Sequence, residues 1–376
     1  MKIAMMASGR EINGVAVHVW LLTRYLLAQG HQVLLMHRPQ AKIAELPGLA
    51  GAEFFQTSFS RAPSELIRVT KRLNAFEPDV VHTHMSSAHT YGALTRIFSR
   101  RPVVATAHAM SLQLHWYFNN RVIATSPAAA RYHVRVNRVS RKAIRMVPNF
   151  IDTQAFPVIA ADERRAARDT LGLPQDAFVF GTVGDVGQRK RQIDLVEVLA
   201  RVVKTEPRAR LLLIGNQDQP YFDQLRDRAA SLGVTDHVIA TGRRTDVQHL
   251  LAAMDVLALS SQRETGPLAV LEAMSRGLPI VSTDVGMVSE FVTENISGHV
   301  VAIGDVDAMA VHMIALAQDA NKRTDMGKAA DAAVRARYDI SMLAPEVESI
   351  LREASQVKNR PLLGFVAQSV GKPARD

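Results

Sequence analysis

The chain has 376 residues, of which 47% are hydrophobic and 22% are charged, an ordinary globular composition. This length predicts about two domains, each large enough to bury its own core. No apolar run approaches the eighteen or more residues of a membrane-spanning helix, and the first run, Ile3–Ala7, is too short for a signal peptide. The absence of cysteine excludes disulfides and thiolate metal sites and favours a reducing cytoplasm.

Positive charge is concentrated in the first part of the chain. Residues 1–155 hold 19 Lys and Arg against 7 Asp and Glu, a net charge of +12, whereas the remainder has a net charge of −3. The densest run, residues 131–145, includes Arg131 and Arg135. Such a surface favours an anionic partner or an anionic membrane, although solvated basic helices would give the same composition. No nucleic-acid-binding motif accompanies the charge, so nucleic acid is not an expected partner.

Short apolar strands alternate with amphipathic helices in the first half. Helical spacing is found at residues 17–29 and 64–76. The predicted strands are 2–7, 32–37, 79–84, 102–107 and 121–126. Repeated strand–helix units predict a mostly parallel sheet with helices on both faces.

A second series of strands follows a charged, proline-containing segment, residues 148–175, which is the best linker candidate. The predicted strands of this series are 177–182, 210–214, 238–240, 255–260, 278–283 and 299–302. A helix is expected at 341–356, and residues 359–376 have the composition of a disordered tail. The predicted fold class is therefore α/β, with two doubly wound parallel-sheet domains.

The most informative segment carries two carboxylates eight residues apart, Glu264 and Glu272. The strand at 255–260 leads into a polar loop with Glu264. Pro267 suits the first position of the following helix and Gly277 suits its end. Both carboxylates should then lie at the carboxyl edge of a sheet, where α/β proteins bind ligands and helix amino termini bind anions. The alternative is a capping glutamate beside an unrelated surface glutamate.

This segment and seven others, in the same order, resemble the retaining nucleotide-sugar glycosyltransferases of the GT-B fold, the family called glycosyltransferase group 1 or family four. The matching segments are Ile12–Val19, Pro78–His84, Val103–His108, Val147–Asp152, a basic loop at 184–191, the glutamate pair, Gly286–Glu290 and Asn295–Gly298. The resemblance covers about residues 1–355. It implies two Rossmann-like domains that face a central cleft. The expected parts are an acceptor-side domain at 1–155, a nucleotide-sugar domain at 156–340, a helix at 341–357 that crosses back to the first domain, and a tail at 358–376.

The resemblance also assigns roles to individual residues. A departing nucleoside diphosphate needs fixed positive charge and N–H donors, and a glycine lets the backbone approach it closely. The implied catalytic residues are His108, Glu264 and Lys190. The implied donor-binding residues are Gly14, Arg189, Lys190, Arg191, Gly266, Pro267, Leu268 and Glu272. The implied acceptor-side residues are His82, His84, Arg131 and Arg135.

The chain departs from the family pattern at two donor-side positions. Asp185 stands where the family usually has an arginine, so we expect Arg189 or Arg191 to supply the missing cation. Thr265 follows Glu264 where the family commonly has glycine and phenylalanine before the proline, and this leaves the donor sugar open.

No metal and no cofactor are expected. His82 and His84 share one face of a strand, but the sequence offers no identifiable third ligand. Asp305 and Asp307 imitate a metal-binding Asp-x-Asp motif, yet they precede a helical run, which makes helix capping the better interpretation.

The implied activity is transfer of a sugar, with its anomeric configuration retained, from a nucleotide sugar to a hydroxyl of a glycan or lipid-linked acceptor. A UDP-sugar is the expected donor, and synthesis of cell-surface polysaccharide or lipopolysaccharide is the expected setting. Two alternatives stay open: a nucleotide-sugar epimerase of the same fold, and a degenerate member that binds sugar nucleotides without catalysis. The expected location is cytoplasmic, with peripheral contact to the inner membrane.

Overall fold

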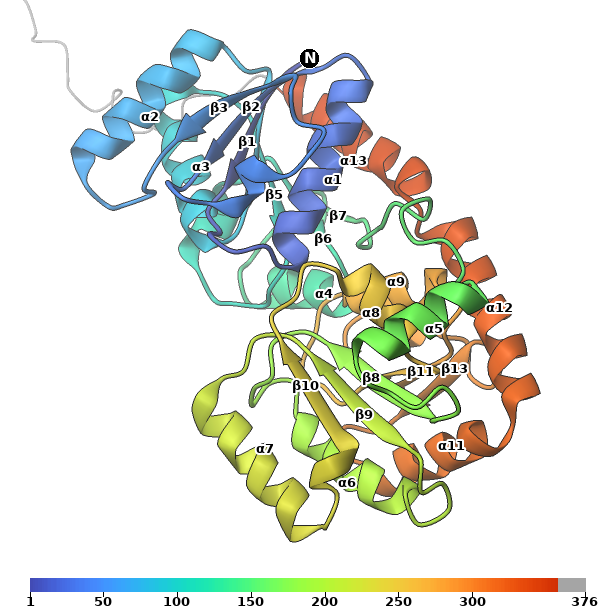
Figure 1. Ribbon diagram of the computed structural model, residues 1–376. Helices are drawn as coiled ribbons and strands as arrows, with labels where there is room; N and C mark the ends of the chain where they lie inside the picture. The colour runs from blue at the N-terminus through green and yellow to red at the C-terminus, as the bar shows by residue number, and fades with distance from the viewer. Residues whose placement is uncertain (358–376) are drawn as a thin grey trace, which may run out of the picture. The chain divides into compact units, whose positions relative to one another are not determined.

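The computed structural model describes residues 1–357, and the tail predicted at 358–376 lies outside this part. The chain divides into two compact units (Figure 1). One unit contains Met1–Val147 and, of the described residues, 343–357, and the other contains Pro148–Met342. Each unit is built on one parallel β-sheet, which confirms the predicted α/β fold class.

The sheet of the first unit has seven strands in the order β3-β2-β1-β4-β5-β6-β7. Their bounds are β1 (Lys2–Ala7), β2 (Gln32–His37), β3 (Ala52–Gln56), β4 (Val80–His84), β5 (Val103–Ala107), β6 (Arg121–Ala124) and β7 (Ile144–Met146). Five of them were predicted from apolar runs. The two edge strands, β3 and β7, were missed because β3 exposes Glu53 and Phe54 and β7 has only three residues.

Both faces of the first sheet are covered, so its central strands are buried on both sides. In β1, Ala4 and Met6 pack against the helices α2 and α3, and Ile3 and Met5 on the alternate positions are fully buried as well. The helices of this unit are α1 (Gly14–Ala28), α2 (Pro63–Phe76), α3 (Ser86–Ser99) and α4 (Pro127–Arg135), with 3-10 turns η1 (Lys42–Glu45) and η2 (Leu114–Phe118).

The sheet of the second unit has six strands in the order β10-β9-β8-β11-β12-β13. Their bounds are β8 (Val179–Val183), β9 (Arg210–Ile214), β10 (Val238–Gly242), β11 (Val256–Leu259), β12 (Ile280–Thr283) and β13 (Gly298–Val301). All six coincide with predicted strands to within two residues. Because β8, β11 and β12 are neighbours and parallel, the loops that follow them meet at one edge of the sheet.

Helices cover the second sheet, and one of them occupies the predicted linker. Residues 148–175 contain α5 (Ala161–Thr170), whose Arg164 and Arg168 both pair with Asp255, so this segment is part of the unit and not an open linker. The other helices are α6 (Gln192–Val202), α7 (Gln219–Ser231), α8 (Val247–Ala252), α9 (Leu268–Ser275), α10 (Val288–Phe291), α11 (Val306–Gln318) and α12 (Ala320–Arg337), with a 3-10 turn η3 (Thr235–His237).

The last described helix, α13 (Ile340–Ser355), begins in the second unit and continues in the first. Within the first unit it is held to α1 and the following turn by Glu348, which accepts from Tyr25 Oη at 3.0 Å and pairs with His31 Nε2 at 3.0 Å. Among residues 1–357, no helix is both long enough and apolar enough to cross a membrane.

Candidate active site

The loops after β8 and β11 bring Glu264 and Lys190 together. Lys190 Nζ lies 2.9 Å from Oε1 of Glu264, and Arg189 Nη1 lies 2.6 Å from the same oxygen. Ser261 Oγ donates a third hydrogen bond to that oxygen at 3.1 Å. Two residues predicted to be catalytic are thus in direct contact, across 74 positions of sequence.

The charges in this cluster are stabilised by one another. Burial alone would raise the pKa of Glu264, but Lys190 and Arg189 hold this pKa below its usual value. Glu264 is therefore ionised at neutral pH. Lys190 is itself buried, with 8% of its surface exposed, so its charge acts in a weakly screened environment.

The 184–191 loop is shaped around the Lys190 side chain. Gly184 has φ of +134°, and a Cβ there would lie 3.0 Å from Lys190 Cε and 3.2 Å from Nζ. A side chain at this position would therefore compete with the lysine for the same space. From β11, Ser260 Oγ donates to the carbonyl oxygens of Lys190 and Arg191 at 2.8 and 3.0 Å. Ser260 had no sequence signal apart from its place at the end of a predicted strand.

Two further contacts fix the position of the loop that contains Glu264. Gly286 has φ of +63°, and a Cβ there would lie 2.6 Å from the carbonyl oxygen of Thr265 and 2.8 Å from that of Glu264. Asn149 Nδ2 donates to the carbonyl oxygen of Gly266 at 2.6 Å. Asn149 was not predicted as a site residue, although it lies in the segment Val147–Asp152 that carried part of the resemblance.

The helix after the Glu264 loop presents its amino terminus without a side-chain cap. α9 begins at Leu268, so Pro267 is the N-cap residue and not the first helical residue as predicted. The first turn has no acidic residue, and no cap side chain accepts from its N–H groups in the part of the chain that the structure describes. N–H groups at the start of a helix, together with the helix dipole, attract anions.

Glu272 lies on α9, as predicted, and has an unusual protonation state. Desolvation by the surrounding protein raises its pKa to about 7, although the residue keeps partial exposure. Among residues 1–357, no side chain or backbone group bonds to its carboxylate. Glu272 is therefore a carboxyl group that changes charge near neutral pH and has unused hydrogen-bonding capacity.

The two candidate replacements for the missing arginine have different environments. Arg189 contacts Glu264, whereas Arg191 pairs with Asp194 at 2.8 Å, which raises the pKa of Arg191 further above neutrality. Asp185 is exposed on the loop. Arg189 is thus the cation that joins the Glu264 cluster.

Predicted histidines of the first unit form a buried cluster. His84 Nδ1 lies 3.1 Å from His108 Nε2, and His82 Nε2 lies 2.8 Å from Thr106 Oγ1. The prediction that His84 lacks a third potential ligand is wrong. His18, on α1, offers one nitrogen within 4.8 Å of nitrogens of His84 and His108. His18 was not predicted, because in the segment after β1 only Gly14 matched a functional pattern.

The imidazoles of this cluster are neutral at pH 7. Burial and neighbouring histidines hold the pKa of His84 and of His108 well below the usual value, and burial lowers that of His18 to about 4. Nε2 of His84 is buried and has no hydrogen-bond partner in the described chain, so this nitrogen keeps unused hydrogen-bonding or ligating capacity.

Two other potential metal motifs have ordinary structural roles. Asp305 Oδ1 accepts from Ala308 N at 2.9 Å, which confirms the predicted cap of α11. Glu294, His299 and His312 also lie close together, but the two imidazoles stack at 3.9 Å with planes 13° apart. Within this group, His299 Nδ1 is already hydrogen-bonded to Glu294 Oε1 at 2.7 Å.

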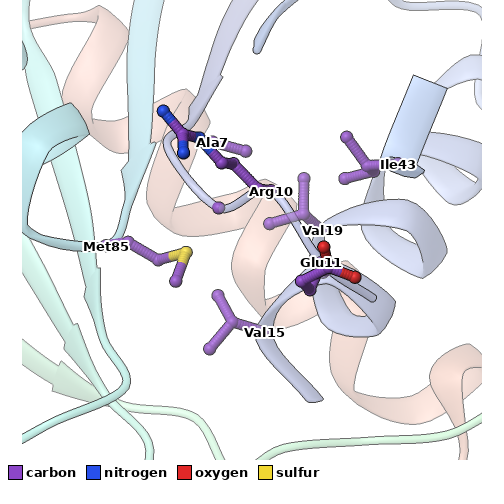
Figure 2. Close-up of a pocket in the computed structure, with 9 residues that line it drawn as sticks. Ala7, Arg10, Glu11, Val15, Val19, Ile43 and Met85 are labelled. Carbon is purple, nitrogen blue, oxygen red and sulfur yellow. The ribbon is translucent and has the colours of Figure 1, made fainter. Parts of the chain in front are cut away.

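The remaining predicted residues of the first unit lie on its surface or beside a small hollow. Gly14 is the first residue of α1, whose start is capped by Asn13 Oδ1, 3.1 Å from the nitrogens of Val15 and Ala16. Figure 2 shows the adjoining pocket with Arg10 and Glu11 at its rim. Its volume of about 10 Å³ suits a single water molecule. On α4, Arg131 and Arg135 are exposed.

Comparison with known proteins connects this geometry to a family. The family model for glycosyl transferases group 1 matches residues 163–333, and that for Glycosyltransferase Family 4 matches residues 12–155. The N-acetyl-alpha-D-glucosaminyl L-malate synthase of Bacillus anthracis is 26% identical over 302 residues, 76% of this chain and 77% of that protein. The lipopolysaccharide core biosynthesis glycosyltransferase LpsE of Rhizobium meliloti is 32% identical over 215 residues, 56% of this chain and 58% of that protein.

The three-dimensional structure is similar to that of a solved protein. The Anabaena protein Alr3699/HepE, crystallised with UDP and glucose, superposes with a TM-score of 0.85 at 21% identity, covering 94% of this chain and 100% of that one. The chain therefore belongs to the group 1 glycosyltransferases, with the GT-B fold, and its activity is glycosyl transfer.

The buried histidines predict a loss of stability in mild acid. Their pKa values in the folded state lie below 6.5, so the unfolded chain binds more protons. This contribution to stability is complete above pH 6.5 and is lost as pH falls toward the folded pKa, which is about 4 for His115. Each histidine of this kind should cost about 1–1.5 kcal/mol between pH 7.5 and 5.5.

Thermal unfolding of wild type and His115→Gln at both pH values measures this effect. The acid-induced fall in midpoint should be about 2–4 °C smaller in the variant. His249→Gln, which removes a histidine with partial exposure, is the control and should follow wild type. Equal acid sensitivity of all three proteins would contradict the assignment.

Proposed function

We propose that this protein is a retaining, metal-independent glycosyltransferase that takes a UDP-sugar as donor. The observation that supports this best is the ionised Glu264, bonded by Lys190 and Arg189 beside the uncapped start of α9. A fixed cation and free helix N–H groups suit a nucleoside diphosphate, and a carboxylate suits sugar hydroxyls. UDP as the nucleotide is suggested by the Anabaena relative crystallised with UDP and glucose.

In this proposal the donor-binding residues contact different parts of the nucleotide sugar. Lys190 and the α9 amino terminus bind the diphosphate and stabilise the charge that grows on it as the sugar departs. The backbone of Gly266, Pro267 and Leu268 borders the same anion. Glu272 accepts from ribose hydroxyls, for which its unused carboxylate oxygens are suited. Glu264 accepts from hydroxyls of the transferred sugar.

His108 is assigned to the donor sugar by the family resemblance. Its imidazole is neutral at pH 7, because burial and nearby histidines depress its pKa. It would therefore contribute a hydrogen bond and not a positive charge. His82 and His84 orient this ring from β4, since His84 Nδ1 shares a proton with His108 Nε2 at 3.1 Å.

Retention of configuration is proposed to follow a front-face route. Glu264 is engaged by three donors, so its charge is stabilised and its nucleophilicity is reduced. The acceptor hydroxyl would then attack from the side of the leaving group, and the departing diphosphate would take the acceptor proton. The bond that breaks is between the anomeric carbon and the diphosphate oxygen, and the new bond joins that carbon to the acceptor oxygen.

The acceptor is proposed to be an anionic glycan or a lipid-linked glycan at the cytoplasmic membrane face. Exposed cations of the first unit support this, among them Arg131, Arg135 and Arg138. Large apolar side chains are exposed in the same unit: Leu112, Leu114 and Tyr117 expose 71%, 87% and 68% of their surfaces. Basic and apolar groups together favour peripheral binding to anionic lipid. A role in lipopolysaccharide or surface-polysaccharide synthesis agrees with the Rhizobium relative.

The two alternatives have less support. The named relatives are a transferase and a synthase that joins a sugar to malate, and neither is an epimerase. A degenerate, non-catalytic member was suggested by Asp185 and Thr265. Arg189 supplies a cation to the Glu264 cluster despite Asp185, which weakens the main reason for that idea.

Removing the diphosphate cation should weaken donor binding. Lys190→Ala is expected to reduce the affinity for UDP by about 1.5–3 kcal/mol, the range of a charge-assisted contact. Isothermal titration calorimetry on protein of verified fold measures the effect. Lys204→Ala, which removes an exposed lysine of the same unit, is the control and should bind like wild type. Glu272→Ala should also bind UDP more weakly, and unchanged affinity in both site variants would remove them from the donor site.

Catalysis should be independent of divalent metal. Asp305 of the Asp-x-Asp motif caps α11, and Asp307 pairs with Arg201 at 2.9 Å, so both carboxylates already have structural partners. Sugar transfer measured after exhaustive EDTA treatment should equal that of untreated enzyme. Loss of activity that magnesium or manganese restores would overturn metal independence.

Membrane binding should depend on lipid charge and on salt. Each basic residue near an anionic leaflet contributes on the order of 1 kcal/mol, and the Debye length falls from about 10 Å at 0.1 M salt to about 3 Å at 1 M. Co-sedimentation with vesicles of anionic or neutral lipid should show salt-sensitive binding to the anionic ones alone. Equal pelleting with both vesicles, or binding to neither, would favour a small dissolved acceptor.

A further inference from the structure

The second unit contains a large cavity on the side of its sheet opposite the Glu264 cluster. Its volume is about 450 Å³. Asp255, directly before β11, and Pro279, directly before β12, lie in its wall, so it opens at the amino-terminal edge of the strands. Glu264 and Lys190 lie at the carboxyl-terminal edge. The cavity, which we call the arginine pocket, is therefore distinct from the proposed donor site.

Cations outnumber carboxylates in the arginine pocket. The lining cations are Arg164 on α5, Arg276 at the end of α9, and Arg323 and Lys328 on α12. The lining carboxylates are Asp255 and Asp331. Both are already used: Asp255 pairs with Arg164 and Arg168 at 2.9 Å each, and Asp331 pairs with Arg335 at 2.7 Å. Carboxylates outside the lining pair with two of the cations, Glu163 with Arg276 and Asp325 with Lys328, so Arg323 is the lining cation for which the described chain shows no ion pair.

Two of these guanidinium groups have unused donors. Arg164 Nη1 donates to the carbonyl oxygen of Met254 at 2.7 Å and to Asp255 Oδ1 at 2.9 Å. Arg323 Nη1 donates to the carbonyl oxygens of Leu316 and Ala317. In the described chain, Nε and Nη2 of both arginines have no acceptor. A guanidinium fork with free N–H groups matches the oxygens of a phosphate or carboxylate.

The arginines in and beside the pocket repel one another electrostatically. The pKa of Arg164 is lowered, chiefly by burial and also by Arg168, Arg323 and Arg276. Arg276 is wholly buried; it bonds to the Pro157 carbonyl and to Glu163, and its Nε has no acceptor. Like charges held at low dielectric repel strongly, and a bound anion would offset that repulsion.

The framework around the pocket is close-packed. Gly327 on α12 lies against the turn after α9, because a Cβ at Gly327 would be only 2.0 Å from the carbonyl oxygen of Gly277. Arg323 is fixed over the ring of Phe178 at 5.6 Å. Val158, of which 54% is exposed, and the partly buried Ile159 add an apolar strip to the polar wall. A volume of 450 Å³ and this strip leave room for an organic group in addition to an oxyanion.

We propose that the arginine pocket is a second ligand site, which binds a small organic phosphate monoester. The free nitrogens of Arg164 and Arg323 and the Lys328 ammonium hold the phosphoryl oxygens, and Val158 and Ile159 contact the organic part. This proposal does not rest on the identity of the sugar donor or acceptor. The other interpretation of the same residues is a water-filled hollow with solvated arginines, and the two differ in whether binding is specific and saturable.

Calorimetric titration of the full chain with glucose 6-phosphate, in the presence of saturating UDP, tests the proposal. Binding to one site is expected, and inorganic phosphate should bind to the same site more weakly. Arg323→Gln and Lys328→Gln should each weaken binding by about tenfold, as for the loss of one charge-assisted contact. Arg337→Gln removes an exposed cation at the end of α12 that does not line the pocket, and it should bind like wild type.

Three results would overturn the proposal. The first is no saturable binding of either phosphate compound. The second is binding that saturating UDP abolishes and that Lys190→Ala weakens, which would place the phosphate in the donor site. The third is an equal loss in Lys328→Gln and Arg337→Gln, which would indicate a general response to surface charge. Because Lys328 is exposed and its ion pair with Asp325 spans 3.5 Å, Lys328→Gln remains informative even if Arg323→Gln does not fold.

Discussion

The second unit's site depends on one shared oxygen, Oε1 of Glu264. Arg189, Lys190 and Ser261 all donate to it, so one carboxylate connects the loop after β8 with the loop after β11. Burial favours protonation of such a group, and the two cations reverse that preference. The ion pairs therefore keep a negative charge on Glu264 directly beside the positive charges of Lys190 and Arg189. Either charge alone would be costly to bury, and together they are stable.

Close backbone approaches make that arrangement possible. Gly286 brings its turn to within van der Waals distance of the carbonyls of Glu264 and Thr265, where a side chain could not fit. Gly184 leaves the space that the Lys190 side chain fills. Asn149 then fixes the carbonyl of Gly266, directly before α9. The site is thus positioned by small residues and backbone contacts, and the charged side chains are placed as a consequence.

Much of this architecture could be predicted from the sequence. Eleven of the thirteen strands in residues 1–357 were found, because a strand buried on both faces is mostly apolar, as residues 3–7 of β1 are. The edge strands β3 and β7 were not predicted, because an edge strand can be polar or very short. Glu264, Glu272 and Lys190 were proposed as site residues from their motifs, and the structure places Lys190 against Glu264. Asn149, Ser260 and His18 were not, because their roles are contacts with residues far away in the sequence.

The sequence by itself determined the class of fold, the family and the residues of the donor motifs, because hydrophobic periodicity and local motifs are properties of neighbouring residues. Only the tertiary structure decided which of these residues form ion pairs with one another. It assigned Arg189 to Glu264 and Arg191 to Asp194, although the two arginines are two positions apart. It also grouped His18 with His84 and His108, and Arg164 with Arg323. Such groupings depend on how strands and helices pack, and pairing across the fold is not encoded in the spacing along the chain.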